Sequence, residues 1–387
     1  MSLFAARDEE DDSAARGGAG RPRTPRRVLV GWVLIAAAVV LAAVLAATPA
    51  PYVIEGPGPV YNTLGVDTPV YSPQGTTRPS ANAKQVLAIP SAVKTYPTKG
   101  QLDLLTVNLY GNPDALPSWS QVVQAWFDPS RTVVPVDVEF PAGETSDQSS
   151  RQSAQDMATS QQDATVAALR ELGHTIGEQV IVGSVDPTLP ANGILKPDDA
   201  FVSVNGVAVT GTAQLRKLIG ANGASTPATF VIERAGVRQT VRITPVESSG
   251  AAVIGVYIGV RYDRIPVAVT INLSDVGGPS AGQMFALGII DKLTPGFLNA
   301  GLDVAGTGTI DGDGDVGAIG GIRQKMYAAK AAGATIFLAP ASNCDEVVGH
   351  VPAGLSVFAV NTLRDSLVVL AAESSGTGVG ALPTCGS

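Results

Sequence analysis

The sequence predicts an α/β (α+β) protein preceded by one N-terminal transmembrane helix. Three observations support this fold class. Residues 28–48 are apolar and carry no charged side chain. Residues 174–247 alternate short β-branched runs with turns, a pattern typical of a small β-rich domain. Residues 266–290 and 305–340 each combine a strand pattern, a glycine-rich loop and an amphipathic helix pattern.

Composition limits the classes of partner. The chain has 387 residues, of which 45% are hydrophobic and 16% charged, and this length allows two or three domains. Its formal net charge is −8 and only 5% of its residues are aromatic, which argues against nucleic acid as a partner. We therefore expect a globular protein with a membrane segment and no nucleic-acid partner.

Residues 28–48 are long enough to cross a bilayer, because a rise of ~1.5 Å per residue gives roughly 30 Å. Four basic residues lie close before this segment: Arg21, Arg23, Arg26 and Arg27. By the positive-inside rule, residues 1–27 form a disordered cytoplasmic tail and the bulk of the chain is extracellular. The alternative is a cleaved signal peptide ending in LAATPA, but the long basic segment and long apolar stretch favour an uncleaved single-pass anchor.

The chain has two cysteines, Cys344 and Cys385, and two histidines, His174 and His350. Neither pair has the spacing of a zinc site, so we expect no metal and no cofactor. An extracellular location instead predicts a disulfide between Cys344 and Cys385.

Residues 49–84 are rich in proline and glycine and are predicted to form a linker. The runs KQVLAI and LDLLTVNLY then predict strands, WSQVVQAWF predicts a helix, and DATVAALRELG predicts a second helix that ends at Gly173. The first helix and its tryptophans are expected to pack in the core through Trp119, Val122, Val123, Trp126 and Phe127.

Within residues 174–247, the segment ANGILKPDDAFVSVNGVAVTGTAQLRKLI joins two turns to a helix. It resembles the pattern of bacterial PDZ domains, which bind an extended peptide as an added strand at a sheet edge. The resemblance implies a groove between the strand after Ile176 and Gly177 and the helix near Leu215. The alternative is a module that only spaces or shields another domain.

The motif GPSAG lies between the strand pattern PVAVTINL and the helix pattern AGQMFALGII. Ser280 is thereby placed at a helix start, close to backbone N–H groups that could hold an oxyanion. The motif also satisfies G-x-S-x-G of α/β-hydrolases, which would require His350 as the catalytic histidine. That fold needs a large doubly wound sheet around Ser280, whereas a PDZ-like unit ends shortly before it.

A later segment, GGIRQKMYAAKAAGATIFLAP, predicts a helix containing Lys325, which follows Ser280 by 45 residues. Together with GPSAG it resembles the proteolytic domain of Lon proteases, which use a Ser-Lys dyad. The resemblance implies that Ser280 is the nucleophile and Lys325 the general base. It also implies supporting positions at Thr307, Gly278, Pro279 and Ala281.

Lys325 can act as a base only if its pKa falls, because a free lysine titrates near ~10.4. Lys330 on the same helix is expected to point elsewhere. The sequence departs from the Lon pattern at Gly277 and Thr309, where that family usually carries acidic residues. It contains no GxxxxGK[ST] motif, so no ATP is expected. The run DGDGD lacks the glycine and terminal acid of a calcium loop and predicts a hairpin turn.

The combination of anchor, PDZ-like and Lon-like segments resembles the membrane-anchored PDZ-containing Lon-like serine proteases of Gram-positive bacteria. It implies an ATP-independent extracytoplasmic endopeptidase that acts on protein or peptide substrates, with an oligomer possible. The PDZ unit would interrupt the protease domain, leaving residues 85–173 and 250–372 as its two parts and residues 373–387 as a tail. The alternatives are a catalytically silent PDZ scaffold and an α/β-hydrolase-like esterase.

Overall fold

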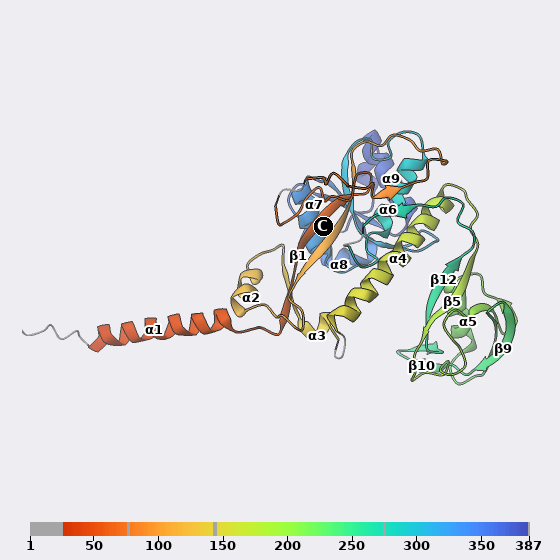
Figure 1. Cartoon of the computed structure of the whole chain (residues 1–387), viewed down its shortest axis with the longest axis horizontal. Helices are drawn as coiled ribbons and strands as arrows, with labels where there is room; N and C mark the ends of the chain where they lie inside the picture. Colours follow the sequence, from red (N-terminus) through yellow and green to blue (C-terminus); the bar gives the residue numbers. More distant parts are fainter. Residues whose placement is uncertain (1–25, 76–77, 142–144, 274–275, 386–387) are drawn as a thin grey trace, which may run out of the picture.

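The structure, a computed structural model, describes residues 26–75, 78–141, 145–273 and 276–385. Helix α1 (Arg26–Ala47) extends away from a body that contains two sheet units (Figure 1). Its segment Val28–Ala47 is long and apolar enough to cross a membrane, and none of it is buried in the protein. Both an anchor and a signal sequence fit that description. The predicted tail lies outside the described residues, apart from Arg26 and Arg27.

The first unit is built on a mixed six-stranded sheet. Strand β3 pairs in parallel with β14 and antiparallel with β1, and β14, β17 and β18 are parallel neighbours. In spatial order the strands are β18 (Ser356–Val360), β17 (Ile336–Pro340), β14 (Asp303–Gly306), β3 (Gln101–Tyr110), β1 (Tyr52–Asn62) and β4 (Thr132–Pro135). Short pairs flank it: β2 (Leu87–Ala88) with β13 (Thr270–Ile271), and β15 (Thr309–Ile310) with β16 (Val316–Gly317).

Helices cover both faces of this sheet. Alternate residues of β17 point to opposite sides, so Ile336 and Leu338 join one hydrophobic cluster and Phe337 and Ala339 another. The helices are α4 (Ser146–Glu171), α6 (Gly282–Leu293) and α9 (Leu363–Ser375) on the first side, and α7 (Ile322–Ala332) and α8 (Cys344–Val347) on the second. This layered arrangement agrees with the α/β class.

The prediction of a linker over residues 49–84 is wrong for β1, which lies inside the sheet between β3 and β4. Proline and glycine normally mark turns, but here they accompany a shift of register between Pro57 and Val60. A Cβ on Gly58 would lie 2.7 Å from main-chain atoms of Thr106, so the close approach of these strands requires glycine.

Helix α4 begins 17 residues before the predicted DATVAALRELG segment, at Ser146 instead of Asp163. A capping box between Thr145 and Gln148 starts it. Its N-terminal half is polar because much of it faces solvent, which explains why hydrophobic periodicity alone placed the start too late.

Helix α2 (Trp119–Trp126) forms where predicted, but only part of its predicted core face is buried, namely Val122 and, partly, Trp119. Only Val122 and Ala125 are buried, in a small cluster next to β1. The side chains of Val123, Trp126 and Phe127 are 42%, 59% and 85% exposed. A short helix at the edge of a domain has one small neighbour to pack against, so its remaining apolar residues stay outside.

The second unit is a sheet with the strand order β12-β5-β6-β8-β9. The elements are β5 (Glu178–Val185), β6 (Ala200–Val204), β7 (Val207–Ala208), α5 (Thr212–Asn222), β8 (Ala228–Arg234), β9 (Val237–Ile243), β10 (Val246–Ser248), β11 (Ala251–Val253) and β12 (Val256–Tyr262). A hairpin turn at Ala235 and Gly236, both with positive φ, joins β8 to β9.

The predicted boundaries of this unit, residues 174–247, end too early. Strand β12 belongs to the same sheet because it pairs with β5 along its whole length. The predicted start of the second protease segment at residue 250 is therefore also too early. The two ends of the unit meet, with Asp263 N donating to Gly177 O at 2.9 Å.

Candidate active site

Ser280 lies in a tight loop directly before α6, and helix α4 holds this loop from one side. The N–H of Gly278 donates to Ser153 O at 2.8 Å, and Ser160 Oγ donates to Pro279 O at 2.8 Å. Gly278 has a φ of +81°, a conformation that favours glycine. These contacts fix the backbone on the N-terminal side of Ser280.

Lys325 comes from α7, which begins directly after Gly321. Gly321 has a φ of +67°, and a Cβ there would lie 2.6 Å from Val107 Cγ2, so this turn requires glycine. The turn points the Lys325 side chain into the protein, where the residue is only 3% exposed. Lys325 Nζ lies 2.8 Å from Ser280 Oγ.

Burial lowers the pKa of Lys325 from 10.5 to about 7, because the apolar surroundings disfavour the charged form. Glu55 on β1 acts in the opposite direction and raises the pKa. The outcome is an amine that is largely neutral slightly above pH 7 and able to accept a proton.

Thr307, which follows β14, joins both predicted dyad residues. Its Oγ1 donates to Ser280 O at 3.0 Å and accepts from Lys325 Nζ at 3.1 Å. The N–H of Gly308 also donates to Ser280 O at 2.9 Å. The structure therefore brings Ser280, Lys325 and Thr307 together from a loop, a helix and a strand end that are far apart in sequence.

Ser280 and Lys325 both line a cavity of about 570 Å³. Gly277 and Thr309, the two neutral departures from the Lon pattern, both line it, and so do the acidic residues Glu55 and Glu139. Ala281 is the N-cap of α6, and its N–H has no hydrogen-bond partner within the described part of the chain. This backbone donor is free to meet an oxyanion that forms next to Ser280.

His350, the base that the hydrolase alternative requires, and Lys330, the second lysine of α7, both lie away from Ser280. His350 does not line the cavity, and its Nδ1 lies 2.9 Å from Val348 O. Lys330 donates to Gly354 O at 2.9 Å, away from Ser280. The strand that precedes Ser280 belongs to a two-stranded pair and not to the large sheet that a hydrolase elbow requires.

The residues predicted for the groove of the second unit, Ile176, Gly177 and Leu215, do not line the groove that the structure shows, although the helix that contains Leu215 does. Ile176 is buried against α4 in a cluster with Val166 and Leu169. Gly177 is the next residue and lies directly before β5. Leu215 is fully buried in the core of the unit. A groove of about 820 Å³ lies instead between α5 and the edge strand β12. The signal for it was VYIGVRY, a strand pattern that lies beyond the predicted domain boundary.

A network at the base of this unit connects it to α4. Arg170 of α4 donates to Ile176 O at 2.6 Å and pairs with Asp313 at 2.8 Å. Tyr262 OH donates to Asp163 of α4 at 2.6 Å. Because Ser153 and Ser160 hold the nucleophile loop, one helix contacts both the second unit and the candidate site.

The DGDGD run forms the turn between β15 and β16, as predicted. Asp311 Oδ1 accepts from the N–H groups of Asp313 and Asp315 at 3.0 and 2.9 Å. Across the described ranges, no group of three or more His, Cys, Asp or Glu residues is arranged to hold a metal ion.

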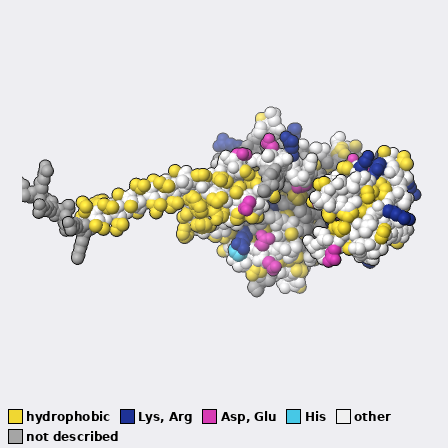
Figure 2. All heavy atoms as spheres, turned by 90° about the horizontal axis from the view of Figure 1, so that it is seen from below, with side chains coloured by type: hydrophobic (Ala, Val, Ile, Leu, Met, Phe, Trp, Pro, Cys, Tyr) yellow, Lys and Arg dark blue, Asp and Glu magenta, His cyan; other side chains and the backbone are white. Residues whose placement is uncertain are grey.

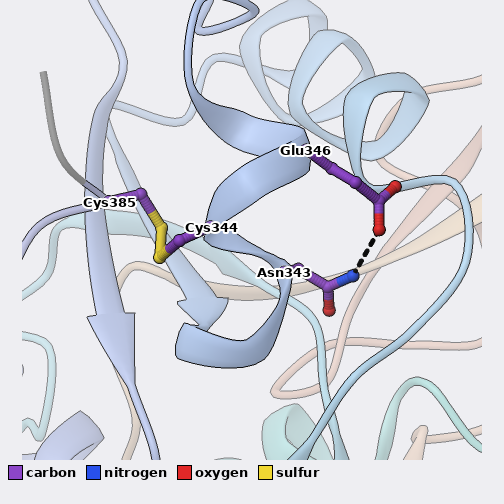
Figure 3. Close-up of a disulfide and its surroundings, with 4 residues drawn as sticks. All are labelled: Asn343, Cys344, Glu346 and Cys385. Atoms are coloured by element: carbon purple, nitrogen blue, oxygen red, sulfur yellow. Dashed lines mark hydrogen bonds between the residues drawn. A yellow bond between two sulfur atoms is a disulfide. The ribbon is translucent and has the colours of Figure 1, made fainter.

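Cys344 and Cys385 form a disulfide (Figure 3). It holds the chain end against α8 beside Asn343, a 2% exposed residue that sequence reasoning missed. Asn343 Nδ2 donates to Glu346 Oε1 at 2.9 Å, and the Asn343 amide makes two 2.9 Å bonds to the backbone of Ile319. Ile319 lines the cavity, so this amide positions one wall of the site.

Removing the disulfide is expected to destabilise the protein. The two cysteines are 41 residues apart, and a closed loop of that length contributes about 3–4 kcal/mol to the free energy of unfolding. Cys344→Ser, Cys385→Ser and the double variant should lose similar amounts in denaturant unfolding. Two free thiols in the protein purified from its native host, detected by alkylation and mass spectrometry, would contradict this expectation.

Comparison with known proteins finds similarity over part of the chain. Residues 267–371 match the family model of the Lon protease (S16) C-terminal proteolytic domain. Lon protease 2 of Herpetosiphon aurantiacus is 35% identical over 116 residues, which are 29% of this chain and 14% of that protein. Lon protease 1 of Sorangium cellulosum is 37% identical over 118 residues, 28% of this chain and 14% of that protein.

The chain thus spans about 14% of the length of these curated relatives. The match supports a serine peptidase with a Lon-type proteolytic segment. Solved structural neighbours include the PDZ domains of SdrC-like proteins from Listeria monocytogenes and Listeria innocua. They are 18% and 20% identical, cover 20% and 21% of this chain and 85% and 92% of those chains, and have TM-scores of 0.20.

Proposed function

We propose that this chain is an ATP-independent, membrane-anchored extracytoplasmic serine endopeptidase in which Ser280 is the nucleophile and Lys325 the general base. The single observation that carries the proposal is the 2.8 Å distance between Ser280 Oγ and a buried Lys325 Nζ. A lysine kept neutral by burial costs stability, and proteins retain such residues where they serve chemistry.

In the proposed reaction, Ser280 Oγ attacks the scissile carbonyl carbon while Lys325 Nζ takes the hydroxyl proton. The carbonyl oxygen becomes an oxyanion next to the N–H of Ala281. Lys325 then gives its proton to the leaving amine, and the peptide bond breaks to leave an acyl ester on Ser280. Water then attacks this ester while Lys325 Nζ takes a proton from the water. Lys325 returns this proton to Ser280 Oγ as the ester bond breaks, which releases the carboxylic acid product and regenerates Ser280 and the neutral amine. Thr307 keeps the amine directed at Ser280 throughout.

Several organisational features belong to the same proposal. We infer that α1 anchors the chain with residues 1–27 in the cytoplasm, and that the 178–262 unit is a PDZ domain inserted between the two parts of the protease domain. The first and last residues around this unit, Gly177 and Asp263, are hydrogen-bonded to each other, which supports an insertion. Strand β12 is the edge of its sheet among the described residues, and this edge, beside α5, suits a peptide that adds as a strand.

A serine-reactive probe tests the catalytic proposal on the full chain in the absence of ATP. Labelling at Ser280, located by mass spectrometry, should disappear in Lys325→Met and persist in His350→Ala. Labelling that survives in Lys325→Met but is lost in His350→Ala would reverse the assignment and favour the hydrolase alternative. Absence of labelling and of cleavage in the wild-type chain would favour a silent scaffold.

Filling the groove tests the PDZ proposal. Gly220 of α5 lines the groove, and no atom lies within 4 Å of a Cβ placed on it, so Gly220→Trp should fold normally. We expect turnover of long, unfolded protein substrates to fall about tenfold, because lost docking of an extended segment weakens their binding, while short peptides are cleaved as before. Gly380→Trp is the matched control, since that glycine is equally open and lies outside the groove. Equal losses for both substrate classes would contradict the docking role.

A further inference from the structure

Helix α2 carries an apolar face that no other described element covers. Val123, Trp126 and Phe127 recur at positions i, i+3 and i+4 and are all exposed. The helix WSQVVQAW contains no charged residue. Asp128 and Arg131, which follow it, pair with each other at 3.2 Å. A two-ring apolar face of this kind is unusual for a surface in contact with water.

The position of α2 is fixed by the chain segment that leaves α1. Trp119 N donates to Thr48 O at 3.2 Å, and Ala50 N donates to Pro117 O at 2.8 Å. The inner face of α2 packs on Ala50 through a cluster that also contains Val122. In Figure 2 the hydrophobic surface of α1 continues onto the part of the body next to its end. Helix α2 therefore begins where α1 ends.

The position of α2 at the end of α1 sets its depth relative to a membrane that α1 crosses. The segment Val28–Ala47 has 20 residues, which at ~1.5 Å per residue span roughly the 30 Å of a hydrocarbon core. If α1 spans the bilayer, Thr48 lies at the boundary between acyl chains and headgroups. Tryptophan and phenylalanine side chains partition into this interface, and helices with one apolar face lie in its plane.

We propose that the face formed by Val123, Trp126 and Phe127 lies in the interface of the outer leaflet of the lipid bilayer. This inference rests on the proposed anchoring by α1 and adds a second membrane contact to it. Two attachments, a spanning helix and an interfacial one, fix the orientation of the body and hold the candidate active site at a constant height above the bilayer. Because α2 has no basic residue, its contact depends on apolar burial and is insensitive to salt and to anionic lipid.

The three tryptophans of the chain, Trp32, Trp119 and Trp126, allow a direct test. The full-length Trp32→Phe/Trp119→Phe variant keeps only Trp126 as a fluorophore. It is reconstituted in phosphatidylcholine vesicles with lipids brominated either near the glycerol or near the chain ends. We expect bromine near the glycerol to lower the emission of Trp126 by about half, and bromine near the chain ends to lower it less. High salt should leave the quenching unchanged.

The Trp119→Phe/Trp126→Phe variant, which keeps only Trp32 inside α1, reports on the anchor separately. Quenching of Trp32 without quenching of Trp126 would leave the anchor standing and overturn the inference. Trp126 that is shielded from acrylamide but not quenched by bromine would mean that a protein surface covers it, which also overturns the inference. Loss of quenching in both variants would overturn the anchor, and the inference with it.

Discussion

Ser280→Ala is expected to lower the rate of peptide cleavage by about 10⁴-fold or more, because it removes the attacking oxygen. The other hydroxyl beside Lys325, Thr307 Oγ1, is buried and donates to Ser280 O, so it cannot replace Ser280 Oγ. The free energy of unfolding should change by less than ~1 kcal/mol, since the substitution removes one hydroxyl from a half-buried loop. The bonds that hold this loop use the main-chain oxygens of Pro279 and Ser280 and survive the change. Cleavage of a short fluorogenic peptide and thermal unfolding of the same preparation measure both effects.

Ser153→Ala is the matched control for this prediction. Ser153 lines the same cavity, but its contact to the nucleophile loop is made by its main-chain oxygen, which accepts from Gly278 N. The variant should therefore cleave at close to the wild-type rate. His350→Ala should also remain active. Activity that persists in Ser280→Ala and disappears in Ser153→Ala would show that Ser280 is not the nucleophile.

Ser280 and Lys325 could be singled out from sequence because each lies in a short segment with its own glycine-containing pattern. Gly278 and Gly321 are required by backbone conformation at the two turns, so the chain signals both turns directly. The distance between Ser280 and Lys325 depends on a long-range fold, which the Lon resemblance supplied. Asn343 carried no comparable signal, because its role depends on a backbone contact to a loop 24 residues away.

The errors have a common physical origin in tertiary context. Hydrophobic periodicity describes what a segment would bury, and it cannot say whether a neighbour exists to cover it. Trp126 has the pattern of a core residue and lies outside because α2 has only a small partner. Proline and glycine in β1 suggested a linker, although the bulge they create belongs to the sheet. The edge strand β12 was missed because strand order, which places it beside α5, depends on pairing across more than 70 residues.

The pH dependence of the protein should follow Lys325. Its pKa in the folded chain is about 7, against 10.5 for an ordinary lysine. Activity should therefore rise as the pH passes through about 7, where the neutral amine becomes the dominant form. Glu55→Gln should move this rise to lower pH, because the carboxylate favours the ammonium form. A pH profile of kcat/KM for a short peptide measures both, and a rise unaffected by Glu55→Gln would contradict the role of this pair.

The free energy of unfolding should also depend on pH through Lys325. Between about pH 7 and 10.5 the unfolded chain binds a proton at Lys325 that the folded chain does not, so this group makes stability rise with pH over that window. The difference between the pKa values of Lys325 in the folded and unfolded chain corresponds to up to about 5 kcal/mol. At and below pH 7 the free energy of unfolding is lower by this amount. Lys325→Met should consequently be inactive yet more stable than the wild type near neutral pH, with a gain that shrinks toward pH 10.5.

Lys325→Arg separates charge from chemistry. A guanidinium remains protonated at any pH at which the protein folds, so this variant should be inactive throughout the profile and should lose stability where Lys325→Met gains it. Denaturant unfolding of the three proteins at pH 7 and near pH 10 provides the comparison. A wild-type chain whose stability relative to Lys325→Met does not change between these pH values would mean that Lys325 titrates normally. An amine that is fully charged at neutral pH could not take the proton from Ser280, and the dyad mechanism would have to be abandoned.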